Sequence, residues 1–425
     1  MPGGRRPVGV TIEVVRLAEW IAREAVLFDL EYPASVDAVT DRVVAAQDVD
    51  LLGLGEALHG SEEILLIRNR MFQRLVEKHG FSAIVIETSS PQARAIDEYV
   101  RGERKKSDPK VGAWFAKGFG KLAANRELVD WMRGYNEKAA TKLSFYGFDI
   151  PLGAAGLASP RRVLDIALRH LQTIAPSRAR AYRMRFKPLL GELMDWEKPE
   201  AMYDPTQSIG RTPRALELRA VTLDLIDELR SRGADPDAIH HAELARKLLD
   251  AHAALATPGA YATFLGMRDQ VMAENLLHYV DRERGRGKLF VFSAGGHLKR
   301  GQVHWSLPPG DDVKVWSPAG SHLTQAMGSR YAVVGMALGA SEANGVPAPE
   351  AGTIEAAFLA AGGSMLIATR GLPADEIDSP PPRSGSALNP TYYWLTPESF
   401  SDFEWLMFLE STTYPRGAQP LSDWG

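Results

Sequence analysis

The sequence predicts an α/β fold: a three-layer α/β/α core with a largely parallel sheet and an inserted helical subdomain. Short apolar runs bounded by turn residues recur along the chain, which is typical of strands buried on both faces. Most of these runs are followed by a helical pattern, and strands that alternate with helices indicate a parallel sheet with helices on both faces. Between residues 160 and 280 long Ala/Leu/Arg-rich stretches replace the apolar runs, which predicts the helical insert.

Taken in order, residues 8–27 have apolar positions interrupted by charged ones, and we expect an amphipathic first helix there. The expected strands are 49–55, 81–87, 143–150, 288–294, 331–339, 365–370 and 405–409. The insert is expected to contain helices over 161–174, 213–232 and 237–255. The predicted parts are therefore 1–159 (first part of the core), 160–280 (insert) and 281–425 (second part of the core).

The proline-rich stretch 373–390 also contains Gly, Ser and Asp and is too poor in apolar residues to form a core of its own. We expect it to be a loop or lid over another part of the molecule.

The composition excludes several classes of protein. The 425 residues include no cysteine, which excludes disulfides and thiol nucleophiles. With 49 basic and 53 acidic residues the net charge is −4, which gives no overall attraction to nucleic acid or anionic lipid. No apolar run approaches the ~20 residues of a membrane span, and residues 8–27 lack a signal-peptide core. We expect a cytoplasmic protein with a small-molecule substrate and neither nucleic-acid nor membrane partners; its oligomeric state stays open.

Polar side chains stand at the carboxyl ends of four predicted strands. Glu56 and His59 follow the first of these strands, Glu87 and Asp149 end the next two, and His297 follows the strand over 288–294. Ligands of parallel sheets bind at this edge, and carboxylates with imidazoles suit general acid–base catalysis. The alternative is that the acids cap the helices that follow.

A helix predicted over 61–78 places Arg68 in its apolar stripe with Ile64, Met71 and Leu75. A buried guanidinium needs a carboxylate or another anion, and the Arg68 side chain is long enough to reach back toward residues 56–59. The alternative is a differently oriented helix with Arg68 in solvent.

A second helix, over 262–280, places Arg268 and Asn275 on one face with Val271 and Tyr279. These two polar side chains are candidates for substrate binding. An ordinary buried hydrogen bond between helices is the alternative.

Motifs for other chemistries are missing or incomplete. Glu56 and His59 have the Glu-x-x-His spacing of some metal sites, but a second such pair on a partner helix and a His-Glu-x-x-His motif are both lacking. A Gly-x-Ser-x-Gly elbow, a dinucleotide fingerprint and a P-loop are lacking too. We therefore expect no cofactor, and the metal site is the weaker hypothesis.

Several segments together resemble the erythromycin esterase family. They are Gly55-Glu-Ala-Leu-His-Gly60, Arg68, Gly80-Phe81, Glu87, Trp131-Met-Arg133, Tyr135-Asn136, Phe145-Tyr-Gly-Phe-Asp149, Arg268-Asp269, Met272-Ala-Glu-Asn275, Gly320-Ser-His-Leu323 and Gly328-Ser-Arg-Tyr331. The resemblance implies a three-layer α/β core with a helical insert. It also implies hydrolysis of a macrolide lactone without a metal, by water activated with histidine and carboxylate groups. It puts Glu56, His59, Arg68 and Glu87 in the active-site cleft and makes His322 a further candidate for substrate binding.

Two positions differ from the family pattern. Leu58 replaces a Ser or Thr, and the usual His-Asn-x-His after the strand near residue 290 reads Ala294-Gly295-Gly296-His297. The first histidine of that pattern is therefore a methyl group here. We expect either that macrolide hydrolysis is weakened or that His297 takes over the missing role.

From these observations we expect a metal-independent hydrolase acting on an ester or lactone of a sizeable small molecule. His59, oriented by Glu56 or Glu87, would accept the proton, while Arg68 and His297 would stabilise the carbonyl oxygen. One alternative is a natural-product tailoring enzyme in which a substrate hydroxyl attacks, giving transesterification, cyclisation or elimination. The other is a catalytically inactive small-molecule binding protein.

Overall fold

The computed structural model describes residues 9–105, 115–153, 156–306, 313–370, 372 and 380–418. Its strands are β1 (Val26–Phe28), β2 (Leu51–Glu56), β3 (Phe81–Ser89), β4 (Ser144–Asp149), β5 (Lys288–Ala294), β6 (Val303–Ser306), β7 (Val313–Trp316), β8 (Tyr331–Ala340), β9 (Ser364–Ala368) and β10 (Trp405–Ser411). Its α-helices are α1 (Gly9–Glu24), α2 (Pro33–Ala45), α3 (Glu62–His79), α4 (Ser90–Val100), α5 (Ala123–Lys138), α6 (Arg161–Ile174), α7 (Pro176–Leu190), α8 (Leu193–Trp196), α9 (Pro213–Ser231), α10 (Pro236–Leu255), α11 (Tyr261–Glu283), α12 (Gly295–Leu298), α13 (Ala319–Met327), α14 (Ile354–Ala361) and α15 (Ser399–Asp402). Short 3-10 helices are η2 (Ala116–Lys121), η3 (Pro199–Met202), η4 (Pro205–Gln207), η5 (Gly328–Arg330) and η6 (Glu342–Asn344).

One eight-stranded sheet forms the centre of the molecule, in the order β1-β9-β10-β8-β2-β5-β3-β4. The strands from β10 to β4 run parallel to one another, whereas β9 is antiparallel to both β1 and β10. The four strand ends with candidate site residues, β2, β5, β3 and β4, are consecutive neighbours. The parallel arrangement therefore brings those residues to one edge of the sheet.

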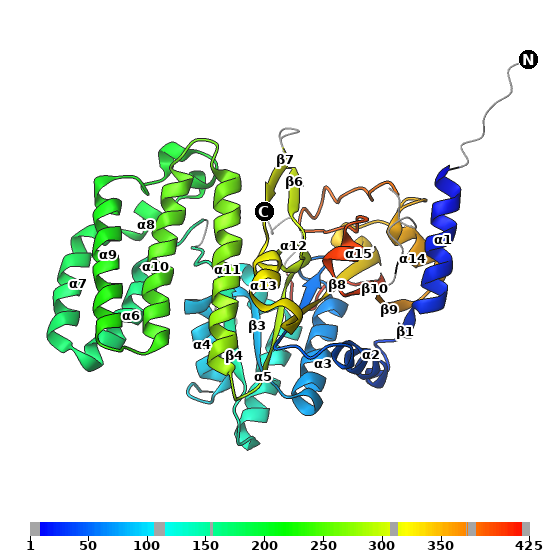
Figure 1. Ribbon diagram of the computed structural model, residues 1–425, viewed down its shortest axis with the longest axis horizontal. Helices are drawn as coiled ribbons and strands as arrows, with labels where there is room; N and C mark the ends of the chain where they lie inside the picture. Colours follow the sequence, from blue (N-terminus) through cyan, green and yellow to red (C-terminus); the bar gives the residue numbers. More distant parts are fainter. Residues whose placement is uncertain are drawn as a thin grey trace, which may run out of the picture.

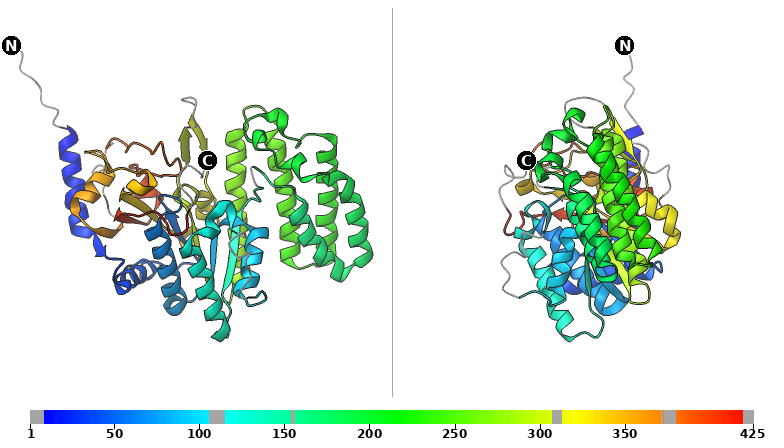
Figure 2. Two further views of the ribbon diagram at one scale, coloured as in Figure 1. Left: turned by 180° about the vertical axis from the view of Figure 1, so that it is seen from behind. Right: turned by 90° about the vertical axis from the view of Figure 1, so that its left-hand side faces the viewer.

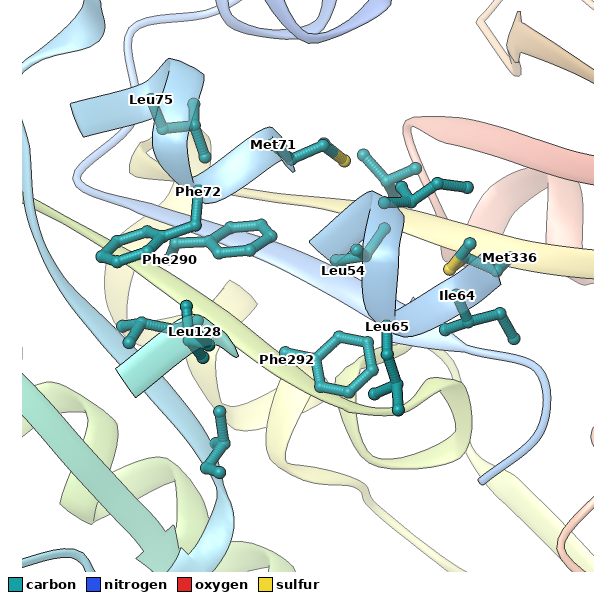
Figure 3. Packing of buried hydrophobic residues seen from close by; sticks show 14 of the residues in the cluster. Leu54, Ile64, Leu65, Met71, Phe72, Leu75, Leu128, Phe290, Phe292 and Met336 are labelled. Carbon is teal, nitrogen blue, oxygen red and sulfur yellow. The ribbon is translucent and has the colours of Figure 1, made fainter. Parts of the chain in front are cut away.

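Alternate residues of each central strand belong to different hydrophobic clusters. Leu52 and Phe290 pack with α2 to α5 on one face, whereas Leu51 and Val291 pack with α1, α11, α13 and α14 on the other. Figure 3 shows the first face, where Phe72 of α3 is stacked on Phe290 with ring centroids 6.2 Å apart. The predicted α/β core with helices on both faces is thus confirmed.

The stretch predicted as an insert forms helices α6 to α10 and lies at the opposite end of the molecule from α1 (Figures 1 and 2). These helices have a hydrophobic cluster of their own, which includes Trp196, Leu225 and Leu248. Helix α11 joins both parts: Phe264 belongs to the cluster of the insert and Leu276 to that of the core. It runs to Glu283, past the predicted boundary at residue 280.

Some features differ from the expectation or lie beyond it. Strand β1 at the sheet edge and the separate hairpin of β6 and β7 were not predicted. Residues 373–379 of the expected proline-rich loop lie outside the described residues, whereas 380–390 contain neither helix nor strand. No helix in the described ranges is long and apolar enough to cross a membrane.

Candidate active site

His59 and Glu56 form a bonded pair at the end of β2. The loop after the strand turns the imidazole back, so that His59 Nδ1 and Glu56 Oε1 are 2.6 Å apart. The ring of Phe119 packs edge-on against His59 with centroids 5.7 Å apart. Burial by itself would lower the pKa of His59, but the Glu56 carboxylate outweighs this and raises the pKa to about 9.

Glu87 connects several polar groups around the site. It lies where the register between β3 and β4 is irregular, a local distortion that re-aims side chains at strand ends. Its Oε2 accepts from the Ser293 hydroxyl at 2.6 Å and from the Ala294 N–H at 3.1 Å. Its Oε1 accepts from Arg268 Nη2 at 3.0 Å and lies 3.6 Å from His297 Nε2.

The electrostatic surroundings keep Glu87 ionised. Burial would raise the pKa of its carboxyl group, but the neighbouring cations of His297, His59 and Arg268 bring that pKa well below its usual range.

Arg268 of α11 holds the ends of β3 and β4 together. Its Nε and Nη2 donate to the two carboxylate oxygens of Asp149 at 2.8 and 2.9 Å, a bidentate geometry that fixes the guanidinium plane. Although burial opposes its charge, Asp149 and Glu87 raise the pKa of Arg268 further above its ordinary value. Arg268 therefore stays charged and balances two carboxylates.

His297 belongs to a second histidine–carboxylate pair. Its Nδ1 is 2.7 Å from Asp269 Oδ1. Asp269 Oδ1 also accepts from the N–H of Ala319, and its Oδ2 accepts from Trp316 Nε1 at 2.6 Å. Burial would lower the pKa of His297, but Asp269 raises it above its ordinary value. His59 and His297 thus each present Nε2 as the ring nitrogen that is not bonded to its carboxylate partner.

Arg68 lies in the buried face of α3, as its spacing predicts, and is only 1% exposed. Its guanidinium does not bond to the loop of residues 56–59. It donates instead to the amide oxygens of Asn69, at 2.7 and 3.0 Å, and Asn125, at 2.7 Å. Burial lowers the pKa of Arg68 to about 10, an effect that the nearby Glu56 carboxylate partly offsets. Glu56 Oε2 itself is buried and has no hydrogen-bond partner among the described residues.

Among the described residues, neither Asn275 nor His322 forms a hydrogen bond or ion pair with the members of these two pairs. Asn275 is fully buried and its amide donates to the carbonyl of Phe148 at 2.7 Å, which ties α11 to β4. This buried hydrogen bond joins a helix to a strand and so differs from the helix-to-helix bond considered as the alternative, and the Asn275 side chain has no exposed surface in the structure. His322 lies half-buried on α13, three residues beyond Ala319.

The segment that directly follows the proline-rich stretch contacts the loop that carries His59. The N–H of Tyr393 donates to the carbonyl of Ala57 at 2.7 Å, and the N–H of His59 lies 3.4 Å from Thr391 Oγ1. Arg383 ties the preceding residues to β8, because its guanidinium donates hydrogen bonds to the carbonyls of Leu338 and Gly339. Residues 391–393 therefore lie against the site loop, whereas Arg383 is bound to β8.

The donor set of the site favours ion pairs within the protein over a metal. No group of three or more His, Cys, Asp or Glu side chains able to hold a metal ion occurs in the part of the chain that the structure describes. Glu56 and His59 are bonded to each other instead of converging on a common point, and Arg268 occupies the space between Glu87 and Asp149.

Comparison with known proteins places the chain in a family. A family model for erythromycin esterase matches residues 76–394. The chain belongs to the erythromycin esterase family. Erythromycin esterase type II of Escherichia coli is 24% identical over 339 residues, which cover 76% of this chain and 77% of that protein. Erythromycin esterase type I of Escherichia coli is 27% identical over 104 residues, 24% of each protein.

Solved structures share the fold of this erythromycin esterase family member. A Bacillus cereus protein has a TM-score of 0.73 at 18% identity, over 96% of this chain and 99% of that one. A succinoglycan biosynthesis protein has a TM-score of 0.73 at 15% identity, over 98% and 100%. An erythromycin esterase mutant in its open conformation has a TM-score of 0.65 at 17% identity, over 89% and 94%.

Sequence reasoning did not single out Asp269, Trp316 and Phe119 as parts of the site. A signal for Asp269 was present, because Leu265, Met272 and Leu276 lie on the same helical face and make it a buried acid in an apolar stripe. No local pattern indicates the other two, because each reaches the site from a segment far away in the sequence.

Proposed function

We propose that this member of the erythromycin esterase family hydrolyses an ester or lactone of a sizeable small molecule, with His59 as the general base. The observation that carries the proposal is the 2.6 Å contact between Glu56 Oε1 and His59 Nδ1. A carboxylate on Nδ1 fixes the orientation of the imidazole and leaves Nε2 for proton transfer.

In the proposed reaction the neutral His59 removes a proton from water, whose oxygen attacks the carbonyl carbon. The carbon–oxygen bond to the alcohol then breaks, and the imidazolium returns the proton to the departing oxygen. His297, whose pKa Asp269 raises and whose Nε2 lies 3.6 Å from Glu87 Oε1, would in its protonated form stabilise the negative charge that develops on the carbonyl oxygen. Arg68, expected to stabilise that oxygen, is better placed to support the site, because its guanidinium is buried among amides.

The test is turnover of erythromycin and of a panel of simpler lactones by the wild type and by the His59→Ala variant. Loss of general-base catalysis should lower kcat by about 10²-fold or more while the circular dichroism spectrum stays unchanged. His304→Ala is a matched control, because this histidine is exposed on β6, and it should retain full activity. Near-normal turnover by His59→Ala would refute the role of His59.

Ala294 favours a second candidate, in which a hydroxyl of the substrate replaces water as the nucleophile. Its N–H holds Glu87, and a methyl group stands where the family pattern has a histidine. A natural-product tailoring enzyme of this kind would transfer or cyclise an ester.

Mass spectrometry separates the candidates, since hydrolysis adds one water and cyclisation does not. Efficient macrolide hydrolysis by the wild type would exclude a decisive role for Ala294, whereas a gain of hydrolysis in Ala294→His would support one. An inactive binding protein would turn over no substrate.

We further predict that a chelator leaves activity unchanged. The carboxylates of Glu87 and Asp149 are already neutralised by Arg268, and both Nδ1 atoms of the site histidines are bonded to carboxylates. The measurement is turnover after dialysis against EDTA, with and without added Zn²⁺, Mg²⁺ or Mn²⁺. Loss of activity that one of these ions restores would instead establish a metal enzyme.

A further inference from the structure

A pocket of about 240 Å³ lies outside the histidine pairs, between the insert and strand β7. Its lining comes from η3 and the loop after it, from the turn between α10 and α11, and from β7. The principal lining residues are Met202, Tyr203, Leu255, Tyr261 and Lys314. We call it the Tyr203–Tyr261 pocket. Whole-ligand pockets usually measure about 300–1,000 Å³, so this volume suits one group of a larger molecule.

Two elements lead from this pocket directly to the candidate active site. On α11, Tyr261 precedes Arg268 by seven residues, which is two helical turns or about 10 Å on the same face. On β7, Lys314 and Trp316 are two residues apart and share one side of the strand, and Trp316 donates to Asp269. Helix and hairpin lie side by side (Figure 1), with Gly266 facing Trp316. The pocket and the site therefore share α11 and β7 as walls.

The lining indicates the kind of group that fits. The rings of Tyr203 and Tyr261 stand 6.1 Å apart at 31° to each other, and Met202 and Leu255 add apolar surface. Tyr203 is 81% exposed, which is unusual for a large aromatic side chain and leaves its ring open to a ligand. A neutral apolar ring matches this chemistry best.

We propose that the Tyr203–Tyr261 pocket binds a neutral, apolar ring of the substrate, two helical turns along α11 from Arg268. This inference rests on the proposed ester hydrolysis, whose substrate class it narrows. The enzyme should prefer esters that carry such a ring at the end of a spacer over esters with the spacer alone.

The experiment compares two carboxylic esters that differ only by a cyclohexyl group at the end of the spacer. In the wild type, kcat/KM should be about tenfold or more higher for the ester with the ring. Tyr203→Ala, which removes one wall, and Ala260→Trp, which fills the pocket, should each bring this ratio close to one. Met184→Ala is the matched control, because Met184 is an exposed apolar residue of the insert outside the pocket, and it should keep the wild-type ratio.

A binding measurement separates this inference from the proposed function. The amide analogue of the cyclohexyl ester, which is far more resistant to hydrolysis, is titrated calorimetrically into wild type, Tyr203→Ala and His59→Ala. We expect Tyr203→Ala to weaken its binding about tenfold and His59→Ala to leave binding dependent on the ring. Equal kcat/KM for both esters, with no effect of the ring on binding, would overturn the pocket inference alone. Ring-dependent binding without turnover of any ester would overturn the hydrolase proposal and leave the pocket as a binding site.

Discussion

His59 retains its proton more strongly than an ordinary histidine because Glu56 stabilises the imidazolium. With a pKa of about 9, only about 1% of the free enzyme has a neutral His59 at pH 7. The same carboxylate makes the neutral imidazole a stronger base. Few enzyme molecules therefore have His59 in its reactive neutral form, but in those molecules His59 binds the proton taken from water more tightly.

The pH dependence of kcat/KM should therefore rise toward alkaline pH. The base form of His59 increases about tenfold for each pH unit between 7 and the pKa of about 9, and the rate should level off above that pH. Glu56→Gln removes the charge that raises this pKa, so the midpoint should move to lower pH. Rates measured between pH 6 and pH 10 test both expectations, and a flat profile between 7 and 9 would contradict the role of His59.

The same ionisation links site chemistry to folding. Because the folded-state pKa of His59 is raised, its contribution to the unfolding free energy is fully present below pH 6.5 and is lost as pH rises through about 9. The conditions that release the base for catalysis therefore also remove some stability.

Helix α3 supports the site through the Arg68 network. Arg68 and Asn69 bind Asn125 and the carbonyl of Ala124 at the start of α5, and the Asn125 amide donates to the carbonyl of Phe119. Phe119 in turn packs on the His59 ring. The network thus positions the segment that covers the proposed base.

Arg68→Met should destabilise the protein and lower its activity. The substitution leaves two buried amide oxygens without their donors, which costs about 2–4 kcal/mol of unfolding free energy. Urea unfolding and kcat are the measurements, and Arg68→Lys is the comparison that keeps the charge without the forked donor geometry. An unchanged unfolding free energy together with a tenfold or greater loss of kcat would instead support a direct role of Arg68 at the carbonyl.

At the scale of the whole molecule, the insert is joined to the core mainly along one long helix. Helix α11 spans 23 residues and packs its first half in the insert and its second half on the sheet. Helices α7 and α9 lie farthest from the sheet (Figure 1). Regions with few contacts to the main core commonly open without global unfolding.

We predict that the amides of α7 and α9 exchange hydrogen faster than those of β2, β5 and β8. Leu225→Ala, which opens a cavity in the cluster of the insert, should accelerate exchange in α6 to α10 and leave the sheet strands unchanged. Hydrogen exchange followed by mass spectrometry tests this. Uniform acceleration over the whole chain would show that insert and core unfold as one unit.

The long buried strands could be predicted from sequence because continuous apolar runs are rare outside them. Strand β1 was missed because it has three residues at the sheet edge, too few for a pattern. The hairpin of β6 and β7 was missed because each of its strands has only four residues and, among their described side chains, only Trp316 is buried.

The candidate site could be predicted in part from its strand ends. Glu56, Glu87 and His297 come together because neighbouring parallel strands share one edge. The bonding partners could not be predicted, because the pairing of Arg268 with Asp149 joins residues 119 positions apart. The apolar face of α3 predicted that Arg68 is buried. It could not predict that Arg68 binds an amide oxygen instead of a carboxylate, because Asn125 is brought to it by the position of α5.

The position of β10 has a consequence for how the protein is made. This strand pairs with β8 on one side and β9 on the other, and β1 joins the sheet only through β9. During translation β8 and β9 must emerge long before β10 leaves the ribosome, each with an unpaired edge. Strand β1 can therefore join the main sheet only after β10 has left the ribosome, and until then the nascent protein exposes unpaired strand edges of the kind that chaperones protect.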